Sequence, residues 1–233
     1  MSIKLLNLNE AADFLGMEPG DLRALAVCGD IPCVEHGSRM MFDYSELDTW
    51  FTFRLIRHKT TAQKSRRSSS GGNAMAGTMS RLCTLETMST ALPGKTKAAV
   101  LKSLTELAER SGLLYDPREF LEELRRREEI FPTAMAEGVA LVHPERRDEY
   151  ICEAPFIAVA RSERPVHFGE ADGIPTDIFF VISAPDNTEH LKILSHVCRV
   201  IMESGLLDAL RNAATPQEML DAVMSADPIP AEE

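Results

Sequence analysis

A basic segment rich in serine and glycine divides this chain of 233 residues into two parts. It includes residues 64–73, Lys-Ser-Arg-Arg-Ser-Ser-Ser-Gly-Gly-Asn, and the wider stretch 54–81 holds seven Lys/Arg and no Asp/Glu. Because such a segment has few apolar side chains to bury, its composition predicts a solvated, flexible linker. We therefore predict a small domain over residues 1–53, a linker over 54–81, a larger domain over 82–228 and a frayed tail over 229–233.

Charge is distributed unevenly between these parts. The formal charge of the whole chain is −11, but residues 1–53 carry −6, residues 54–81 carry +7 and the remainder carries −12. The acidic total disfavours a generally basic nucleic-acid binder. The basic linker has two interpretations, a simple spacer between domains or an arm that contacts phosphates.

Two further features of the composition narrow the class of protein. The five cysteines are odd in number and have no Cys-x-x-Cys spacing, so they indicate neither a disulfide framework nor a zinc site. The N-terminus lacks a signal-peptide pattern, and no apolar run approaches the roughly 18 residues of a membrane-spanning helix. We predict a cytoplasmic protein without membrane insertion.

Turn and capping residues in the first 53 residues separate short segments with apolar patterns. The predicted elements are a helix capped by Asn7 and Glu10 and ended by Gly16, a helix from Pro19 to Gly29, strands over 31–34 and 39–42 around a turn, and a helix from Ser45 that buries Leu47 and Trp50.

Four motifs in this part are similar to the helix-turn-helix domain of phage excisionases and mercury-resistance-type regulators, over about residues 5–52. They are Leu8-Asn-Glu-Ala-Ala-Asp-Phe-Leu-Gly16, Gly29-Asp-Ile-Pro32, Gly37-Ser-Arg39 and Leu47-Asp-Thr-Trp50. The resemblance implies a small, mostly α winged helix-turn-helix domain whose second helix enters the major groove and whose wing contacts the DNA backbone.

Candidate DNA-contacting residues are Arg23 in the second helix, Arg39 in the wing, and Arg66 and Arg67 in the linker. The second helix also carries acidic residues, which repel phosphates, and basic residues are scarce in this part. The alternative is therefore that the N-terminal domain docks onto a protein.

After the linker, helical apolar patterns alternate with short apolar runs. Apolar stripes predict helices over 97–111 and from Asp116, and capping signals predict later helices from Asn187 and Thr215. Runs over 139–142, 156–160 and 178–182 are short and bounded by Pro, Gly or charge, as buried strands are. The pattern predicts an α/β domain in which helices cover a mixed sheet.

Two histidines stand at the ends of predicted elements in this domain: His143 follows the first apolar run, and His190 opens a helix. A neutral imidazole nitrogen is nucleophilic, and at an ordinary pKa of about 6.5 the ring is mostly neutral in the cytoplasm. It can accept a phosphoryl group, and Arg127 and His190 can supply the positive charge and hydrogen-bond donors that this transfer needs.

Other ligand sites are not predicted. No third metal ligand stands at a diagnostic spacing, so neither zinc nor another cofactor is expected. Gly94-Lys95-Thr96 resembles the end of a nucleotide-binding loop, but Ser89 stands where that loop requires glycine. The remaining histidines are expected to be surface or hydrogen-bonded residues: His36, His58, His167 and His196.

The second domain resembles the fructose/mannitol/nitrogen-regulatory class of enzyme IIA of the bacterial phosphoenolpyruvate-dependent phosphotransferase system, over about residues 82–228. The motifs are Arg127-Glu128, Pro132-Thr-Ala, Glu137-Gly-Val-Ala-Leu-Val-His143, Asp177-Ile-Phe-Phe and Asn187-Thr-Glu-His-Leu191. The resemblance implies an α/β domain that accepts a phosphoryl group from a histidine phosphocarrier protein. His143 matches the acceptor, His190 the second histidine beside it, and Arg127 the active-site arginine.

This sequence departs from the class at two points. Val142 stands where a proline usually precedes the acceptor histidine, and Ala134-Met-Ala136 replaces a usually glycine-rich turn. Neither change removes a chemical group, so we expect slower transfer and not loss of the chemistry, because a small displacement of a nucleophile lowers its rate.

Together these features predict a regulatory phosphohistidine carrier, a component of the phosphotransferase system and not a free-standing enzyme. Its partners would be a histidine phosphocarrier protein and, as candidates, DNA and a regulated protein, with an output in transcriptional or nitrogen regulation. No sugar channel or next carrier is recognisable in the sequence. Two alternatives stay open: a non-catalytic interaction protein that retains both folds, and a sugar-specific enzyme IIA that feeds a separate permease.

Overall fold

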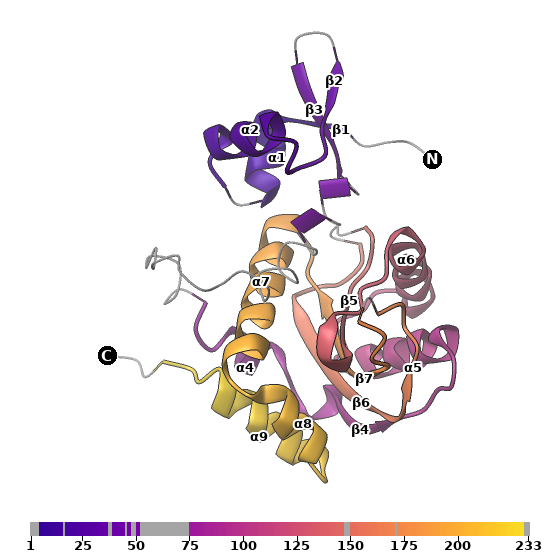
Figure 1. The fold of residues 1–233 in the computed structure, drawn as a ribbon. Coiled ribbons are helices and arrows are strands. Elements are labelled where there is room, and N and C mark those ends of the chain that lie inside the picture. The colour runs from indigo at the N-terminus through magenta and orange to yellow at the C-terminus, as the bar shows by residue number, and fades with distance from the viewer. Residues whose placement is uncertain are drawn as a thin grey trace. The chain divides into compact units, whose positions relative to one another are not determined.

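The structure, a computed structural model, divides into two compact units, Met1–Ser65 and Arg66–Glu233 (Figure 1). The residues that it describes are 5–15, 17–36, 39–44, 46–47, 50–51, 75–146, 150–170 and 172–230. Most of the predicted linker lies outside these residues, and so do Arg66, Arg67, Gly16 and Ser45.

The described part of the first unit contains helices α1 (Leu8–Leu15) and α2 (Pro19–Val27), a three-stranded antiparallel sheet, and helical residues at 44, 46–47 and 50–51, where a third helix was predicted. The strands are β1 (Leu5–Asn7), β2 (Val34–His36) and β3 (Arg39–Asp43), and their order in the sheet is β1-β3-β2. Two helices followed by a hairpin is the predicted order. The winged helix-turn-helix assignment itself stays a prediction.

Local signals account for the two helices. The Asn7 side chain accepts the backbone N–H groups of Asn9 and Glu10 at 2.9 and 3.1 Å, and the Glu10 carboxylate accepts the N–H of Asn7 at 2.8 Å. This reciprocal pairing is the predicted capping box. Helix α2 opens with Pro19 and is followed by Gly29, whose φ of +73° suits glycine at a helix end.

The side chains of Leu22, Phe42 and Leu47 are fully buried and form the centre of this unit. The Trp50 indole N–H donates to the carbonyl of Asp30, which ties the described end of the unit to the segment after α2. Trp50 is only half-buried, whereas the sequence predicted that it is buried as Leu47 is. Its ring is apolar and its N–H is polar, so a partly exposed position with a backbone acceptor satisfies both.

Two details of the first unit differ from the sequence prediction. The hairpin begins at Val34 and not at Ile31, and the sequence did not indicate β1, which pairs with β3 so that Leu6 lies opposite Phe42. Three residues are too few to show the alternation by which a strand is recognised.

The second unit is an α/β domain with a four-stranded mixed sheet, as predicted. The strands are β4 (Met88–Leu92), β5 (Val139–Val142), β6 (Phe156–Val166) and β7 (Thr176–Ser183), in the order β4-β6-β7-β5. The helices are α4 (Thr78–Leu82), α5 (Lys97–Glu109), α6 (Pro117–Ile130), α7 (Asn187–Glu203), α8 (Leu206–Asn212) and α9 (Pro216–Ala226). Strands β4 and β6 are parallel, β5 and β7 are parallel, and β6 and β7 are antiparallel.

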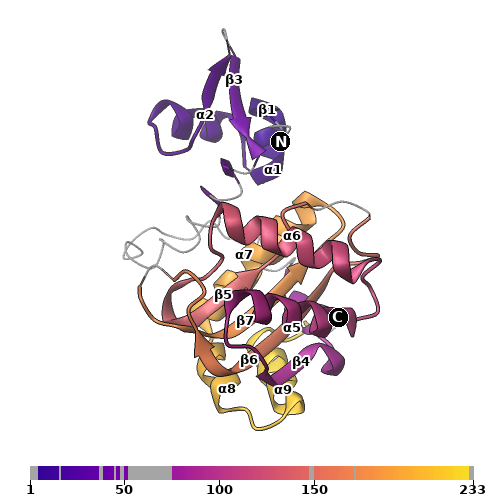
Figure 2. The same ribbon diagram turned by 90° about the vertical axis from the view of Figure 1, so that its right-hand side faces the viewer.

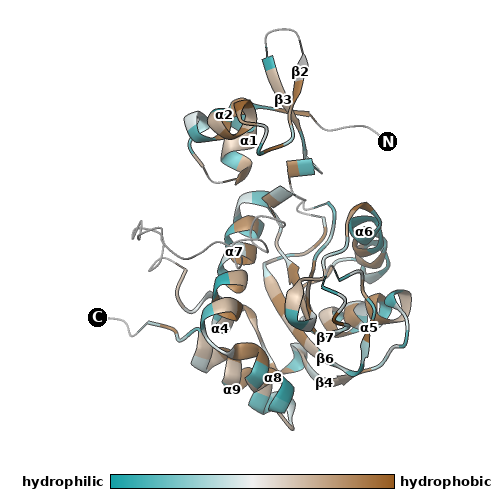
Figure 3. Cartoon of the chain, in the orientation of Figure 1, coloured by the Kyte–Doolittle hydropathy of each residue, from teal (hydrophilic) through white to brown (hydrophobic). Residues whose placement is uncertain are grey.

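Helices cover both faces of this sheet. Helices α5 and α6 lie on one face and α7 on the other (Figures 1 and 2). Alternate residues of a strand point to opposite faces, so a sheet covered on both sides needs continuously apolar strands. This explains why β5 and most of β7 read as unbroken apolar runs, whereas α6 carries many hydrophilic residues (Figure 3). Among the described residues no helix is long and apolar enough to cross a bilayer.

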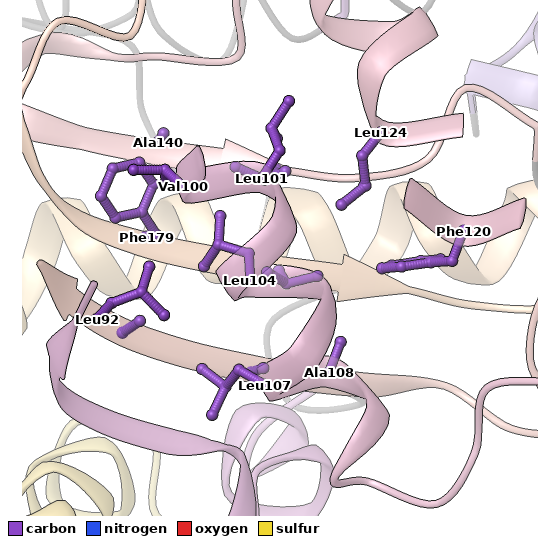
Figure 4. Close-up of a cluster of buried hydrophobic side chains, with 14 of the residues drawn as sticks. Leu92, Val100, Leu101, Leu104, Leu107, Ala108, Phe120, Leu124, Ala140 and Phe179 are labelled. Atoms are coloured by element: carbon purple, nitrogen blue, oxygen red, sulfur yellow. The ribbon is translucent and has the colours of Figure 1, made fainter. Parts of the chain in front are cut away.

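The core between the sheet and α5 is built from the apolar stripe that the sequence indicated. Val100, Leu101, Leu104 and Leu107 are almost fully buried and pack in one cluster with sheet residues that include Phe179 (Figure 4). Burying such side chains stabilises the fold by about 1.5–3 kcal/mol each.

Several predicted boundaries change. Strands β6 and β7 extend beyond their predicted ranges, and β4 was missed because polar residues interrupt its apolar pattern. Helix α5 ends at Glu109, before the predicted end at residue 111. The N-cap of α7 is Asp186 and not Asn187, because the Asp186 carboxylate accepts the N–H of Glu189 at 2.9 Å.

Asp227 ties the end of the described chain to residues 75–81, which the sequence placed in the linker. Its carboxylate accepts the backbone N–H groups of Gly77 and Met79 at 2.9 and 2.8 Å, and His196 Nε2 lies 2.8 Å from it. The linker prediction is therefore wrong at its C-terminal end. The first residue of the predicted tail also approaches this segment, because a Cβ atom on Gly77 would lie 2.7 Å from Cα of Ile229.

Replacing Asp227 by alanine should destabilise the second unit by about 2–4 kcal/mol, because buried N–H donors would lose their acceptor. Urea unfolding followed by circular dichroism measures the change. The matched control is Asp221→Ala, an exposed carboxylate on α9, which should change stability by about 0.5 kcal/mol or less. Equal effects of the two substitutions would contradict the anchoring role of Asp227.

Candidate functional site

The structure brings together the three residues that the sequence singled out in the second unit. His143 directly follows β5, His190 lies in the first turn of α7, and Arg127 lies in the last turn of α6. The two imidazole centroids are 5.1 Å apart with their planes inclined by 54°, and Arg127 Nε lies 3.0 Å from His143 Nε2. All three side chains are almost completely buried.

The sheet topology explains this meeting of distant residues. Strands β5 and β7 are parallel neighbours, with Val142 opposite Val181, so both end at the same edge of the sheet. His143 follows the first strand, and the segment after the second strand leads directly into α7 and His190. In α/β sheets the carboxyl ends of parallel strands are the usual place for such sites.

The contacts of His143 define which ring nitrogen holds the proton. Nδ1 lies 2.8 Å from the carbonyl oxygen of Leu141, which can only accept, so Nδ1 carries the hydrogen. The lone pair of the neutral ring is then on Nε2, where the Nε–H of Arg127 donates to it. Both contacts favour the same tautomer and leave Nε2 as the nucleophilic nitrogen.

Arg127 is held in place by a second contact. Its Nη1 donates to the carbonyl oxygen of Phe131 at 2.7 Å, in the segment that leaves α6. A cation at a helix C-terminus is favourable because the last carbonyl groups carry partial negative charge. The guanidinium thus brings a buried positive charge to His143 Nε2, where a transferred phosphoryl group would carry negative charge.

His190 is placed by the capping of α7. Its backbone N–H donates to the carbonyl of Asp186 at 3.1 Å, within the turn that the Asp186 side chain also caps. Burial, and then the charge of Asp186, raise the pKa of the neighbouring Glu189. The N-terminal end of a helix favours a nearby anion, which suits a phosphoryl group beside His190.

Glu123, which no sequence motif indicated, fixes the chain that follows His143. Its carboxylate is 2% exposed, accepts the N–H of Arg146 at 3.1 Å and pairs with Arg126 at 2.6 Å. Its backbone carbonyl accepts the N–H of Glu145 at 3.2 Å. The spacing in the sequence could have indicated Glu123, because it precedes Arg127 by one helical turn and both residues therefore lie on the same, buried face of α6.

A tight turn fixes the other end of β5. Glu137 has φ +66° and Gly138 has φ +73°, and a Cβ atom on Gly138 would lie 3.0 Å from the Asp177 carboxylate. Arg211 forms two hydrogen bonds to Asp177, both 2.8 Å, and donates to the Glu137 carbonyl. The hydrogen bonding to Asp177 raises the pKa of Arg211.

Val142, at the position of the usual proline, is buried in the strand.

The other predicted residues lie away from these contacts. Arg23 is exposed on α2 and Arg39 is exposed on β3. The side chain of Thr96, in the segment that resembled a nucleotide-binding loop, caps α5 by accepting the N–H of Ala99 at 3.3 Å. In the described part of the chain no group of three or more His, Cys, Asp or Glu residues could hold a metal ion.

Nitrogen NMR of the imidazole groups of the isolated protein should show His143 with a protonated Nδ1 and an unprotonated Nε2. The Leu141 carbonyl and Arg127 Nε–H both stabilise this tautomer, so it should dominate over the mixture found in a solvated histidine. The internal reference is His196, whose Nε2 lies 2.8 Å from the Asp227 carboxylate and whose Nδ1 accepts from Arg199, so that its ring should show the opposite tautomer. A His143 ring with its hydrogen on Nε2 would contradict the geometry.

Comparison with known proteins supports the family that the site indicates. The nitrogen regulatory protein of Pseudomonas aeruginosa is 30% identical over 135 residues, which are 57% of this chain and 86% of that protein. The nitrogen regulatory protein of Bradyrhizobium diazoefficiens is 31% identical over 134 residues, 56% of this chain and 85% of that protein. The fructose-specific EIIABC component of Bacillus subtilis is 26% identical over 151 residues, 64% of this chain but only 23% of that protein.

Solved structures show the same fold for the second unit. Nitrogen regulatory protein IIA-Ntr from Neisseria meningitidis has a TM-score of 0.56 and 22% identity, covering 63% of this chain and 99% of that one. IIA mannitol from Escherichia coli has a TM-score of 0.53 and 19% identity, covering 60% of this chain and 98% of that one. Residues 81–225 match the family described as the phosphoenolpyruvate-dependent sugar phosphotransferase system, EIIA 2. By this match over more than half its length, the chain belongs to the EIIA 2 family of the phosphotransferase system.

Proposed function

We propose that this chain is a regulatory phosphohistidine carrier that accepts a phosphoryl group on Nε2 of His143 from a histidine phosphocarrier protein. The observation that carries this proposal is the pair of contacts on one buried ring: Leu141 accepts from Nδ1, and Arg127 donates to Nε2. Together they orient a neutral nucleophile and place a permanent cation beside it.

The transfer follows from these contacts. The Nε2 lone pair of His143 attacks the phosphorus, and the bond between phosphorus and the donor nitrogen breaks, with its electron pair returning to the donor imidazole. Arg127 exchanges its hydrogen bond to Nε2 for hydrogen bonds to the phosphoryl oxygens. The Nδ1–H stays bonded to the Leu141 carbonyl, which stabilises the positive charge that the ring gains. Positioning and charge stabilisation supply most of the catalysis of such a transfer.

The regulatory part of the proposal rests on the relatives and on the presence of a second unit. Two of the relatives are named nitrogen regulatory proteins. In this chain a separate compact unit precedes the enzyme IIA unit, and phosphorylation would add about −1.5 to −2 of charge to the enzyme IIA unit. This unit is already acidic, so the added charge would strengthen its attraction for the basic linker.

Binding of DNA by the N-terminal unit completes the proposal. Arg23 on α2 and Arg39 on β3 are exposed, and Arg66 and Arg67 in the linker add further positive charge. If the phosphorylated enzyme IIA unit attracts the linker, those arginines become less available to DNA phosphates. Phosphorylation would then weaken DNA binding.

Incubation with phosphoenolpyruvate and the upstream phosphocarrier proteins should add one acid-labile phosphoryl group to the native chain and none to His143→Ala. In His190→Ala the rate of labelling should fall by about 100-fold, because a group beside the transferred phosphoryl is lost. The matched control is His167→Ala, which removes an exposed imidazole and should label like the native chain. Intact mass and acid lability give the readout.

An unlabelled native chain, with the same donor competent on a control acceptor, would favour the alternative in which both units serve only to bind other proteins. Rapid onward transfer from His143 to a sugar-specific carrier would favour the second alternative, a component that feeds a separate permease. Labelling of the His143→Ala chain would contradict the proposed acceptor.

Binding to a random-sequence DNA duplex should weaken as salt rises, with a smaller salt dependence in the Arg23→Ala/Arg39→Ala double variant. Each lost phosphate contact should reduce the slope of log affinity against log salt by about 0.9. The control is Arg118→Ala, an exposed arginine on α6. Fluorescence anisotropy measures the DNA affinity of the phosphorylated and the unphosphorylated protein. Salt-independent binding would contradict DNA contact, and equal affinity before and after phosphorylation would contradict the switch.

A further inference from the structure

A second buried residue of α6 lies next to Arg127 and is a carboxylate. The side chain of Glu128 is only 2% exposed, and its Oε2 lies 2.6 Å from Lys97 Nζ. Its Oε1 accepts the backbone N–H of Thr133 at 3.1 Å and also the hydroxyl hydrogen of Thr133. A buried carboxylate is tolerated where a cation and hydrogen-bond donors compensate for lost hydration, and Glu128 has both.

Lys97 is itself fixed by a second set of contacts. Its Nζ donates to the carbonyl of Phe168 at 3.1 Å and lies 4.9 Å from the centre of the Phe168 ring. As the first residue of α5, it joins that helix to Glu128 on α6. The carboxylate is therefore held from one side by a cation and from the other by Thr133.

Hydrogen bonds continue from Thr133 to the ring of His143. The Thr133 carbonyl accepts the N–H of Leu141 at 3.1 Å, and the Leu141 carbonyl accepts the Nδ1–H of His143 at 2.8 Å. Thr133 is fully buried, and its neighbour Ala134 bridges to Ala140. The segment that Glu128 holds thus lies directly against β5, where it sets the position of the Leu141 carbonyl.

We infer that Glu128 is a positioning residue for His143, acting through Thr133 and Leu141 to set the orientation and tautomer of the ring. Consecutive residues of α6 then control the two ring nitrogens: Arg127 contacts Nε2 directly, and Glu128 governs the partner of Nδ1. The inference rests on the proposed function in one respect, since it assumes that Nε2 is the nitrogen that is phosphorylated.

The test compares Glu128→Gln with Glu129→Gln, because Glu129 is the next residue of the helix and is exposed. Both substitutions remove one negative charge and keep the size of the side chain. In Glu128→Gln the single amide oxygen could accept from either Lys97 or the Thr133 donors, and the NH2 group would face the other donors, so one set of contacts is lost. The first readout is nitrogen NMR of the His143 ring in the unphosphorylated protein, and the second is the rate of phosphoryl transfer against donor concentration.

Glu128→Gln should shift the His143 ring toward a mixture of tautomers and lower the transfer rate at saturating donor by about 10- to 100-fold, because the nucleophile is misplaced. The donor concentration at half-maximal rate should stay near that of the native chain, since Glu128 is buried away from the protein surface. Glu129→Gln should leave the ring signals unchanged. If a folded Glu128→Gln chain showed the same His143 ring signals as the native chain, the inference would be overturned. A lower melting temperature without any change in the His143 signals would overturn it too.

A second pair of variants tests the positioning role of Glu128 if the Glu128→Gln chain does not fold. Thr133→Val removes the hydroxyl donor at nearly constant volume, and Thr133→Ser retains it. Valine should perturb the His143 ring signals and serine should restore them; identical ring signals in the two variants would overturn the inference. The NMR readout needs no phosphoryl donor. A chain that shows the predicted ring changes but is never phosphorylated would therefore support the positioning role while contradicting the proposed function.

Discussion

The hydrogen bond from Arg127 Nε to His143 Nε2 is the contact on which the geometry of the site depends. A buried guanidinium is stable only where acceptors surround it, and the acceptors here are a ring nitrogen and the Phe131 carbonyl. The hydrogen bonds of the Arg127 guanidinium hold the end of α6 against the end of β5. The same contact orients the ring and brings it the positive charge that a phosphoryl group requires.

The rest of the second unit supports that contact from three sides. Glu123 holds the chain after His143, Glu128 holds the segment that pairs with β5, and Arg211 holds the turn before it. All three are charged residues that bond to backbone groups, and such bonds define positions more narrowly than apolar packing does. In the proposed carrier, these bonds would hold His143 in position before any partner binds, which would lower the cost of reaching the transition state.

Local signals in the sequence predicted the helices well and the strands less completely. The capping boxes and the stripe from Val100 to Leu107 involve neighbours in the chain, so they are visible without a fold. Strands β1 and β4 and helices α4 and α8 were missed. Strand β4 has polar interruptions, and α4 depends on Asp227, about 150 residues away. The residue types and a family resemblance indicated the candidate trio. Glu128 belongs to one of the motifs of that resemblance but was given no role, and Glu123 looked like an ordinary surface acid on a highly charged helix.

By itself, the sequence determined the two-part organisation, the α/β class of the second part, and which side chains could do the chemistry, because composition, periodicity and residue type are local properties. Only the tertiary structure decided that His143 and His190 meet, since this depends on β5 and β7 lying parallel and adjacent in the sheet. It also decided which nitrogen of His143 holds the lone pair. That choice depends on a backbone carbonyl and a guanidinium from different elements, and their distances arise only when the chain is packed.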